Sequence, residues 1–162
     1  DVKRAVAAAK YPPEGNRSYG PRVTAKYGGV DEYWKRANDE LLILPQIETI
    51  EAVDNIDEIL QVKGIDGIMV GPSDLTLTIG ASLPLTHPDT EKMIGKILDK
   101  CLEHEVPWGM FTGTFETADR WLRRGGKIAI IGGDLTFVTE NAAKTARDAK
   151  ELLSQVNNKN ST

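Results

Sequence analysis

The sequence predicts an α/β protein in which four βα units share one parallel sheet. Short apolar segments alternate with amphipathic segments along most of the chain, which is the pattern of parallel strands connected through helices. The strand-like segments are apolar on both faces, as strands buried in a parallel sheet are. An eight-stranded βα barrel needs about 250 residues. This chain of 162 residues shows the same alternation of strands and helices, with half the number of βα units.

Two expected helices and a long loop precede the first strand. Residues 1–10 are rich in alanine and predict a helix, which Pro12 and Pro13 end because proline cannot continue the hydrogen-bond ladder. Residues 14–30 hold many glycines and polar residues and predict a long loop. Residues 31–40 predict a second, short helix with Asp31 near its N-cap.

The four βα units follow in order. The expected strands are 41–47, 65–70, 106–112 and 127–131. The expected helices between and after them are 49–62, 73–80, 89–105, 114–124 and 136–156. Apolar residues recur at helical spacing in the longer of these segments. In 89–105 the side chains expected to face the core are Met93, Ile97, Leu98, Cys101 and Leu102. We expect one folded unit over 1–156 and a polar tail over 157–162.

Composition excludes several classes of protein. The net charge is 20 − 24 = −4 with mixed signs, so no basic stripe predicts a nucleic-acid partner. No apolar run approaches the roughly 20 residues of a membrane span. Cys101 is the only cysteine, which excludes an internal disulfide and a cysteine metal cluster and indicates the cytoplasm or another reducing space. Because the chain starts at Asp1 within a helix-like run, we expect the polypeptide to begin earlier.

Two carboxylates follow neighbouring strands. Glu48 ends the first strand and Asp74 follows the second, 74 − 48 = 26 residues later. The carboxyl ends of adjacent parallel strands meet at one edge, where such folds bind ligands. Mg²⁺ prefers one or two protein carboxylates together with waters and substrate oxygens, so this pair is a candidate metal site. The alternative is that each carboxylate caps the helix that follows it.

The residues around this pair are candidate ligand contacts. Gly71 removes a side chain where a ligand approaches, and the N–H groups after Pro72 and Ser73 favour a small carboxylate. A tight strand-to-helix turn without a ligand explains the same residues. Gln46 precedes Glu48 by two residues and so points to the same face, where it contacts a ligand or is an interior amide satisfied by its neighbours.

Other polar residues have simpler explanations. His87 and His104 lie near a helix start and a helix end, and neither has a serine or cysteine arranged as in a catalytic triad. Arg17 in the long loop is a candidate for contact with an anionic substrate, or else a solvated arginine. Asp134 follows the last strand, where a helix cap explains it equally well. Packing is the expected role of Trp34, Trp108 and Trp121.

Several segments resemble one protein family. PQIET (45–49), DNIDEIL (54–60) and GIDGIMVGPSDL (64–75) are similar to the HpcH/HpaI aldolases, metal-dependent pyruvate aldolases of the phosphoenolpyruvate/pyruvate barrel superfamily. The flanking KYPPEGNRSYG (10–20), HPDTEKMIGKIL (87–98) and GGDL (132–135) are similar too. The PQIE sequence also resembles the fungal macrophomate synthase branch. The resemblance implies a (β/α)8 TIM barrel of which this chain, over 1–156, is the C-terminal half.

The resemblance also implies roles for the candidate residues. Glu48 and Asp74 match the carboxylate ligands of Mg²⁺, Mn²⁺ or Co²⁺, and Gln46 matches an active-site glutamine. The turn whose backbone holds the pyruvate carboxylate matches Gly71, Pro72 and Ser73. In the family the cation acts as a Lewis acid and stabilises the pyruvate enolate. That enolate attacks an aldehyde, or forms when an aldol is cleaved.

The same resemblance indicates what lies outside this chain. It covers strands five to eight, so the family's proton-transfer histidine and its arginine are expected in the missing N-terminal half, which is then a partner. The family forms hexamers through its last helix, which makes 136–156 the candidate contact of a homo-oligomer.

The predicted function is therefore that of a cytoplasmic, divalent-metal-dependent aldolase or lyase. Its substrates are pyruvate and an aldehyde, or the corresponding 2-keto-3-deoxy or 4-hydroxy-2-oxo acid. One alternative is a non-catalytic family member or fragment that serves assembly. Others are oxaloacetate decarboxylation and an acyl-CoA lyase on the same metal site, although no basic patch for coenzyme A is visible.

Overall fold

Four parallel strands, connected through helices, form the centre of the molecule. The computed structural model describes residues 1–20, 26, 28–80 and 87–159. The sheet order is β1 (Gln46–Ile47), β2 (Ile68–Val70), β3 (Trp108–Phe111) and β4 (Ile128–Ile130), so each strand pairs with its neighbours in sequence. The helices are α1 (Val2–Ala9), α2 (Val30–Glu40), α3 (Ile50–Asp54), α4 (Ile56–Leu60), α5 (Pro72–Thr78), α6 (Pro88–Glu103), α7 (Phe115–Arg123) and α8 (Asp134–Lys159). The predicted fold class is confirmed.

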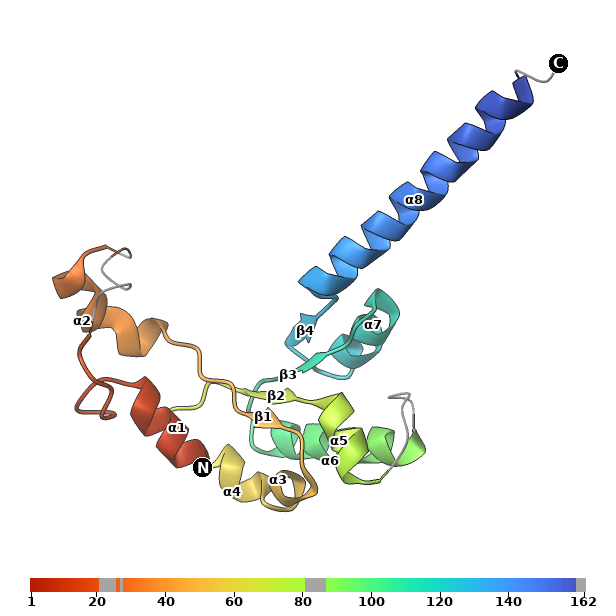
Figure 1. The fold of residues 1–162 in the computed structure, drawn as a ribbon. Coiled ribbons are helices and arrows are strands. Elements are labelled where there is room, and N and C mark those ends of the chain that lie inside the picture. The colour runs from red at the N-terminus through yellow and green to blue at the C-terminus, as the bar shows by residue number, and fades with distance from the viewer. Residues whose placement is uncertain (21–25, 27, 81–86, 160–162) are drawn as a thin grey trace.

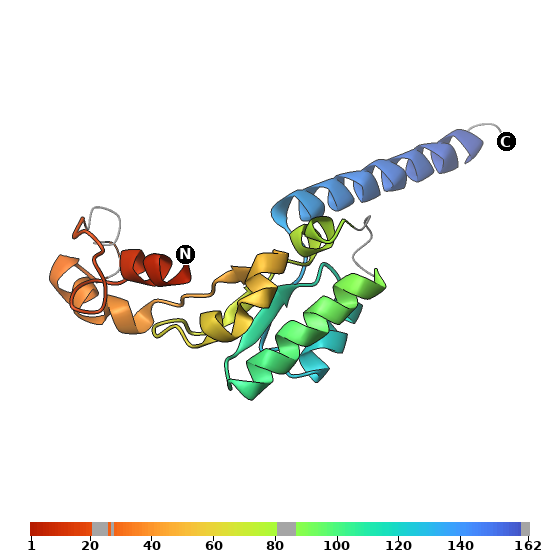
Figure 2. The same cartoon turned by 90° about the horizontal axis from the view of Figure 1, so that it is seen from below.

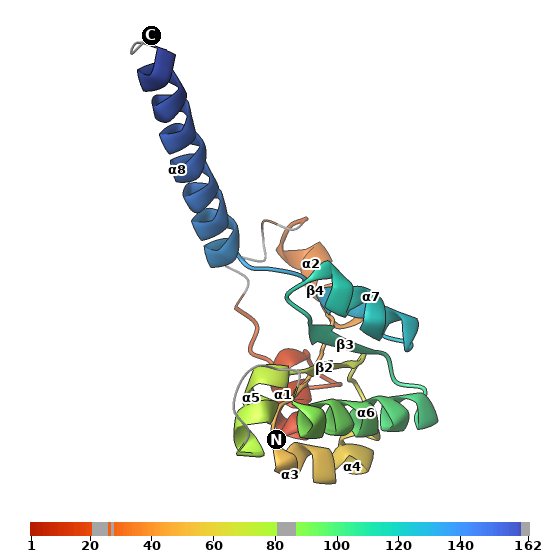
Figure 3. The ribbon, with the colours of Figure 1, turned by 90° about the vertical axis from the view of Figure 1, so that its right-hand side faces the viewer.

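The ribbon has three parts. Figure 1 shows an arm with α1 and α2, a central sheet with α3 to α7, and α8, which projects away from the sheet. Seen from below, α6 lies along the strands between the sheet and the viewer (Figure 2). Figure 3 shows α3, α4 and α6 together beside the sheet, with α7 next to β3 and β4. Among the described helices, none combines the length and the apolar character that crossing a membrane requires.

The core lies between one face of the sheet and the helices. Side chains alternate between the two faces along a strand. Those on the helix side pack with residues of α3, α4, α6 and α7: Ile47, Ile68, Val70, Trp108 and Met110. Burying one such side chain stabilises the fold by about 1.5–3 kcal/mol. The opposite face is open in the described part of the chain, where Phe111 and Ile130 are 43% and 45% exposed.

The first strand is shorter than expected. Only the last two residues of the predicted 41–47 strand join the ladder, and Leu42 is exposed, so the expectation that both faces of this segment are buried is wrong. Pro45 offers no N–H to a ladder. Upstream of it, the Ile43 N–H donates to Oδ2 of Asp66 at 2.8 Å, a side-chain partner instead of a strand.

The helix expected over 49–62 is divided in two. It is interrupted at Asn55, between α3 and α4. The Asn55 Nδ2 group donates to the Glu51 carbonyl at 2.8 Å. Asparagine side chains bond to nearby backbone in this way and disfavour a continuous helix.

Three further expectations need correction. Leu102 is exposed, and Ile94 is buried with Ile97, Leu98 and Cys101 at helical spacing on α6. The N-cap of α2 is Gly29 rather than Asp31. Trp34 is 46% exposed and is not a core residue, whereas Trp108 and Trp121 are buried with their rings edge to face at 6.0 Å.

The ends of the chain follow the prediction closely. The first expected helix is confirmed as α1. The last one is α8, which runs to Lys159 and so includes 157–159 of the segment expected as a tail. Residues 160–162, and residues 21–25 and 27 of the expected loop, lie outside the described residues.

Candidate active site at the carboxyl ends of β1 and β2

Glu48 directly follows β1 and is half-buried. Its Oε2 accepts a hydrogen bond from Nε2 of Gln46 at 2.5 Å, so the two side chains lie on one face, as the spacing predicts. The next helix is capped by Thr49, whose Oγ1 accepts from the Ala52 N–H at 3.1 Å. The alternative role of Glu48 as a helix cap is therefore wrong, and its carboxylate is available for another partner.

Gly71 brings the second strand against Glu48. The Gly71 N–H donates to the Ile47 carbonyl at 3.0 Å, which extends the β1–β2 pairing to the end of both strands. A Cβ atom built on Gly71 would lie 2.8 Å from Cβ of Glu48 and 2.9 Å from Nε2 of Gln46. Only glycine permits this approach, because real Cβ atoms essentially never come so close to another heavy atom.

Asp74 lies in the first turn of α5 and is exposed. The N-cap of α5 is Gly71, and no side chain caps this helix. The alternative role of Asp74 as the helix cap is therefore wrong. Among the described residues, no hydrogen bond or ion pair engages the Asp74 carboxylate, which leaves it free to bind a ligand.

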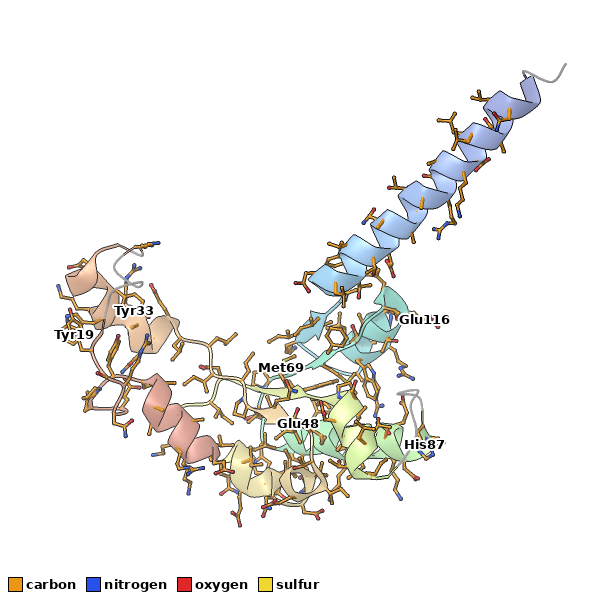
Figure 4. All side chains as sticks on the ribbon, in the orientation of Figure 1. Tyr19, Tyr33, Glu48, Met69, His87 and Glu116 are labelled. Carbon is orange, nitrogen blue, oxygen red and sulfur yellow. The ribbon has the colours of Figure 1, made fainter. Side chains whose placement is uncertain are left out.

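A cavity of about 290 Å³ joins most of the predicted residues. Its polar part consists of Gln46, Gly71, Pro72, Ser73 and Asp74, and its apolar part of Met69, Val70, Phe111 and Ile130. Glu48 is not among the lining residues, but it bonds to Gln46 and lies against Gly71 at the edge of the cavity. Figure 4 shows Glu48 and Met69 in the central sheet region.

The apolar wall is the part of the cavity that the sequence analysis missed. Phe111 pairs in register with Ile130, and Met69 with Gln46, so these side chains share the open face of the sheet. Apolar patterning gave no signal for this wall, because β2 is buried at all three positions and β4 at none, and only the strand register brings these side chains together. The cavity therefore has both a polar and an apolar part.

The histidines and the cysteine do not reach this cavity. His87 is the N-cap of α6, where Nδ1 accepts from the Asp89 N–H at 3.3 Å, and His104 bonds through Nε2 to Asp57 at 2.8 Å. Hydrogen bonding to His104 holds the pKa of Asp57 below its usual value. The expected structural roles of both histidines are confirmed. Burial raises the pKa of Cys101 to about 12, so this thiol is no nucleophile.

Arg17 lies in the N-terminal arm rather than at the cavity. Its guanidinium carbon is 4.7 Å from the ring centroid of Tyr11 and 6.0 Å from that of Tyr33. Figure 4 shows Tyr33 in the arm, apart from Glu48. The structure therefore gives Arg17 an aromatic stacking role and does not bring it to the candidate site. Asp134 begins α8 and accepts from the Leu135 N–H at 2.8 Å.

The residues present fit a divalent cation held by two carboxylates. Among the described residues there is no group of three or more His, Cys, Asp or Glu side chains that would hold a metal. A hard cation such as Mg²⁺ needs no such group, since it keeps several waters and takes one or two carboxylates. Glu48, directly after β1, and Asp74, in the first turn of the helix that follows β2, provide that number.

Comparison with known proteins identifies the family of this chain. The family model for HpcH/HpaI aldolase/citrate lyase matches residues 1–141. A 5-keto-4-deoxy-D-glucarate aldolase of Shigella sonnei is 36% identical over 152 residues, which are 93% of this chain and 59% of that protein. An Escherichia coli protein of the same name matches to the same extent. The chain therefore spans less than two thirds of the length of these relatives.

Solved structures share the fold. An HpcH/HpaI aldolase from Desulfitobacterium hafniense superposes with a TM-score of 0.77 at 32% identity, over 90% of this chain and 57% of that one. A family protein from Burkholderia cenocepacia has a TM-score of 0.81 at 24% identity, over 92% and 60% of the two chains. Macrophomate synthase has a TM-score of 0.69 at 24% identity, over 93% and 56%.

Fold and comparisons together define the class of this protein. It is a βα-barrel protein, of which the chain forms four consecutive units, as the sequence predicts. The chain belongs to the HpcH/HpaI aldolase/citrate lyase family. The resemblance seen in the sequence is thus confirmed, and the likeness to macrophomate synthase holds for the fold.

Proposed function

We propose that this chain supplies the metal-binding half of an aldolase or lyase that forms or cleaves a C–C bond through a pyruvate enolate. One observation carries the proposal: Glu48 and Asp74 follow neighbouring parallel strands, and neither is used as a helix cap. The name of the Shigella sonnei relative supports an aldol substrate of the 2-keto-3-deoxy acid class. The proposed substrates also include 4-hydroxy-2-oxo acids, because aldol cleavage of these acids releases pyruvate as well.

The proposed cofactor is Mg²⁺, Mn²⁺ or Co²⁺ held by Glu48 and Asp74. When bound, such a cation supplies a Lewis acid that polarises the keto oxygen of the substrate and stabilises the enolate. Gln46 holds the Glu48 carboxylate in place through its amide N–H. This leaves the second Glu48 oxygen to face the cation. Second-sphere bonds of this kind orient ligands and tune their affinity.

The turn after β2 and the apolar wall are proposed to bind the organic substrate. Gly71, Pro72 and Ser73 line the cavity beside Asp74. The Gly71 N–H donates to the Ile47 carbonyl and Pro72 has no N–H, so the groups proposed to hold the pyruvate carboxylate are the N–H groups of Ser73 and Asp74 in the first turn of α5. Phe111 and Ile130 also line the cavity and are proposed to contact the methyl end of the substrate; because both are exposed in this chain, exclusion of water there is proposed to need the N-terminal half of the barrel. Exclusion of water strengthens the electrostatic interactions around the carboxylates.

Aldol cleavage and formation also need residues that transfer protons to and from the substrate. Both histidines of this chain are engaged in helix contacts away from the cavity. We therefore propose that the catalytic histidine and arginine come from the N-terminal half of the barrel. In the sheet, β1 and β4 each have one neighbouring strand, so each has an edge to which that half can pair.

We further propose a cytoplasmic homo-oligomer, a hexamer by likeness to the family, with α8 as the subunit contact. Figure 1 shows α8 projecting from the sheet. Its exposed apolar side chains include Leu135, Val138, Leu152, Leu153 and Val156. Exposed apolar surface of this kind marks a protein contact.

A second candidate function is acyl-CoA lyase or oxaloacetate decarboxylase chemistry on the same metal site. The description of the matching family, which joins aldolases with citrate lyase, favours keeping it. A non-catalytic role in assembly is the remaining alternative. Acyl-CoA lyase chemistry and a non-catalytic role both predict no activation of pyruvate alone, whereas oxaloacetate decarboxylation shares the pyruvate enolate with aldol cleavage.

Exchange of pyruvate methyl protons with D₂O, followed by NMR, tests the proposal. We expect the full-length protein to catalyse exchange with Mg²⁺ or Mn²⁺ and to lose it with a chelator, because enolate formation needs no aldehyde. Metal binding without exchange contradicts the aldolase assignment and favours the non-catalytic or acyl-CoA alternative. Exchange that persists with the chelator contradicts the metal requirement.

A further inference from the structure

Two buried threonine hydroxyls lie behind the turn that carries Asp74. Thr76 belongs to α5 and Thr90 to the first turn of α6, and both side chains are 0% exposed. The Thr76 hydroxyl donates to the Pro72 carbonyl at 2.6 Å. The two hydroxyl oxygens are 3.0 Å apart. The pair therefore connects the start of α6 to the residue between Gly71 and Ser73.

The direction of these hydrogen bonds follows from counting protons. Each threonine hydroxyl has one proton to donate. The Pro72 carbonyl can only accept, so the Thr76 proton goes to Pro72. The bond between the hydroxyls then needs Thr90 as its donor. The result is a chain from the Thr90 hydroxyl through the Thr76 hydroxyl to the Pro72 carbonyl.

These two hydrogen bonds stabilise the Gly71–Asp74 turn, which has no side-chain cap. Most helices are fixed at the start by a side-chain cap, but α5 has none, because its N-cap is Gly71. A threonine bond to the carbonyl four residues earlier is common within one helix. Here a second buried hydroxyl from another helix completes it. Removing one member leaves a buried polar group unsatisfied, which costs about 1–3 kcal/mol.

We propose that Thr76 and Thr90 are positioning residues for the metal site, which hold the Gly71–Asp74 turn so that the Asp74 carboxylate faces the cation together with Glu48. The proposal rests on the proposed function. Pro72 is two residues before Asp74, and both line the cavity, so a shift of the Pro72 carbonyl moves the carboxylate. Neither threonine lines the cavity, so they act through the turn and not on the substrate.

Titration with Mn²⁺, read by electron paramagnetic resonance of the free ion, tests this proposal in the full-length protein. Thr90→Val keeps the shape but removes the donor, and we expect about tenfold weaker Mn²⁺ binding, the lower end of the effect of outer-sphere partners. Thr90→Ser restores the hydroxyl, and we expect affinity within about twofold of the parent, well inside the range for outer-sphere loss. Thr76→Val removes the middle hydroxyl and provides a second disruption if Thr90→Val does not fold.

Thr112→Val is the matched control. Thr112 is also buried, and its hydroxyl donates to a backbone carbonyl, that of Ile130, at 3.2 Å. We expect this variant to lose stability but to keep the parent affinity for Mn²⁺. Amide hydrogen exchange at Leu75–Thr78 provides a second readout, because Thr90→Val should open this turn and Thr112→Val should not.

The outcomes separate the two proposals. If the parent binds no Mn²⁺, the proposed function fails and the threonines have no metal site to position. If the parent binds Mn²⁺ and Thr90→Val binds it equally well, the positioning role is wrong and the proposed function stands. Equal losses in Thr90→Val and Thr112→Val also overturn the positioning role, because general destabilisation then explains both.

Discussion

Replacement of Asp74 with asparagine is expected to lower Mn²⁺ affinity by more than about 100-fold, beyond the effect of losing an outer-sphere partner. Asparagine keeps the size of the side chain but removes the charge that a hard cation requires. The effect on folding should be small, because Asp74 is exposed and does not cap α5. The same variant should lose metal-dependent exchange of pyruvate protons. Mn²⁺ titration and NMR exchange measure the two effects.

Asp89 provides the matched control for this experiment. It is also an exposed carboxylate in the first turn of a helix, α6, but it lies outside the cavity lining. Asp89→Asn should bind Mn²⁺ as the parent does. If Asp74→Asn keeps parent affinity, or if both variants lose it equally, the assignment of Asp74 as a metal ligand is contradicted.

A methyl group at Gly71 is expected to disrupt the same site from the backbone side. In Gly71→Ala the new Cβ would lie within 2.9 Å of Glu48 and Gln46 atoms, so the Glu48 side chain must move. Overpacking of this kind costs about 1–3 kcal/mol of the free energy of unfolding. We expect Mn²⁺ affinity to fall at least about tenfold, as for loss of a ligand-orienting contact. Thermal unfolding and Mn²⁺ titration provide the measurements.

Gly133→Ala separates this effect from a general intolerance of alanine. Gly133 follows β4, as Gly71 follows β2, but a Cβ atom at Gly133 would meet nothing within 4 Å. Its unfolding free energy should change by less than about 0.5 kcal/mol, as for ordinary surface substitutions. Parent-like metal binding in Gly71→Ala would show that Glu48 does not need its present position.

The sequence predicted the order of elements because each signal was local and strong. The apolar stripe of α6, for example, has helical spacing. The expected closeness of Glu48 to the turn after β2 is found for a related reason, since β1 and β2 are sequential and parallel, which places Glu48 beside Gly71. The sequence alone left the capping roles of Glu48 and Asp74 open, and the structure decides against both.

What the sequence did not predict depends on three-dimensional contacts. Leu42 was expected inside the sheet, yet it is exposed, and the N–H of the next residue, Ile43, donates to the Asp66 carboxylate. The Thr76–Thr90 pair joins residues of two helices, and no spacing rule indicates it. The wall formed by Phe111 and Ile130 requires the register of β3 and β4, which apolar patterning does not fix.

Anomalous diffraction from crystals of the full-length protein grown with Mn²⁺ tests whether Glu48 and Asp74 bind one metal ion. We expect one strong manganese peak at the carboxyl ends of β1 and β2, with one oxygen each of Glu48 and Asp74 in direct coordination. The remaining positions should hold waters or pyruvate oxygens. A manganese ion bound elsewhere, or bound by only one of these two carboxylates, would contradict the account.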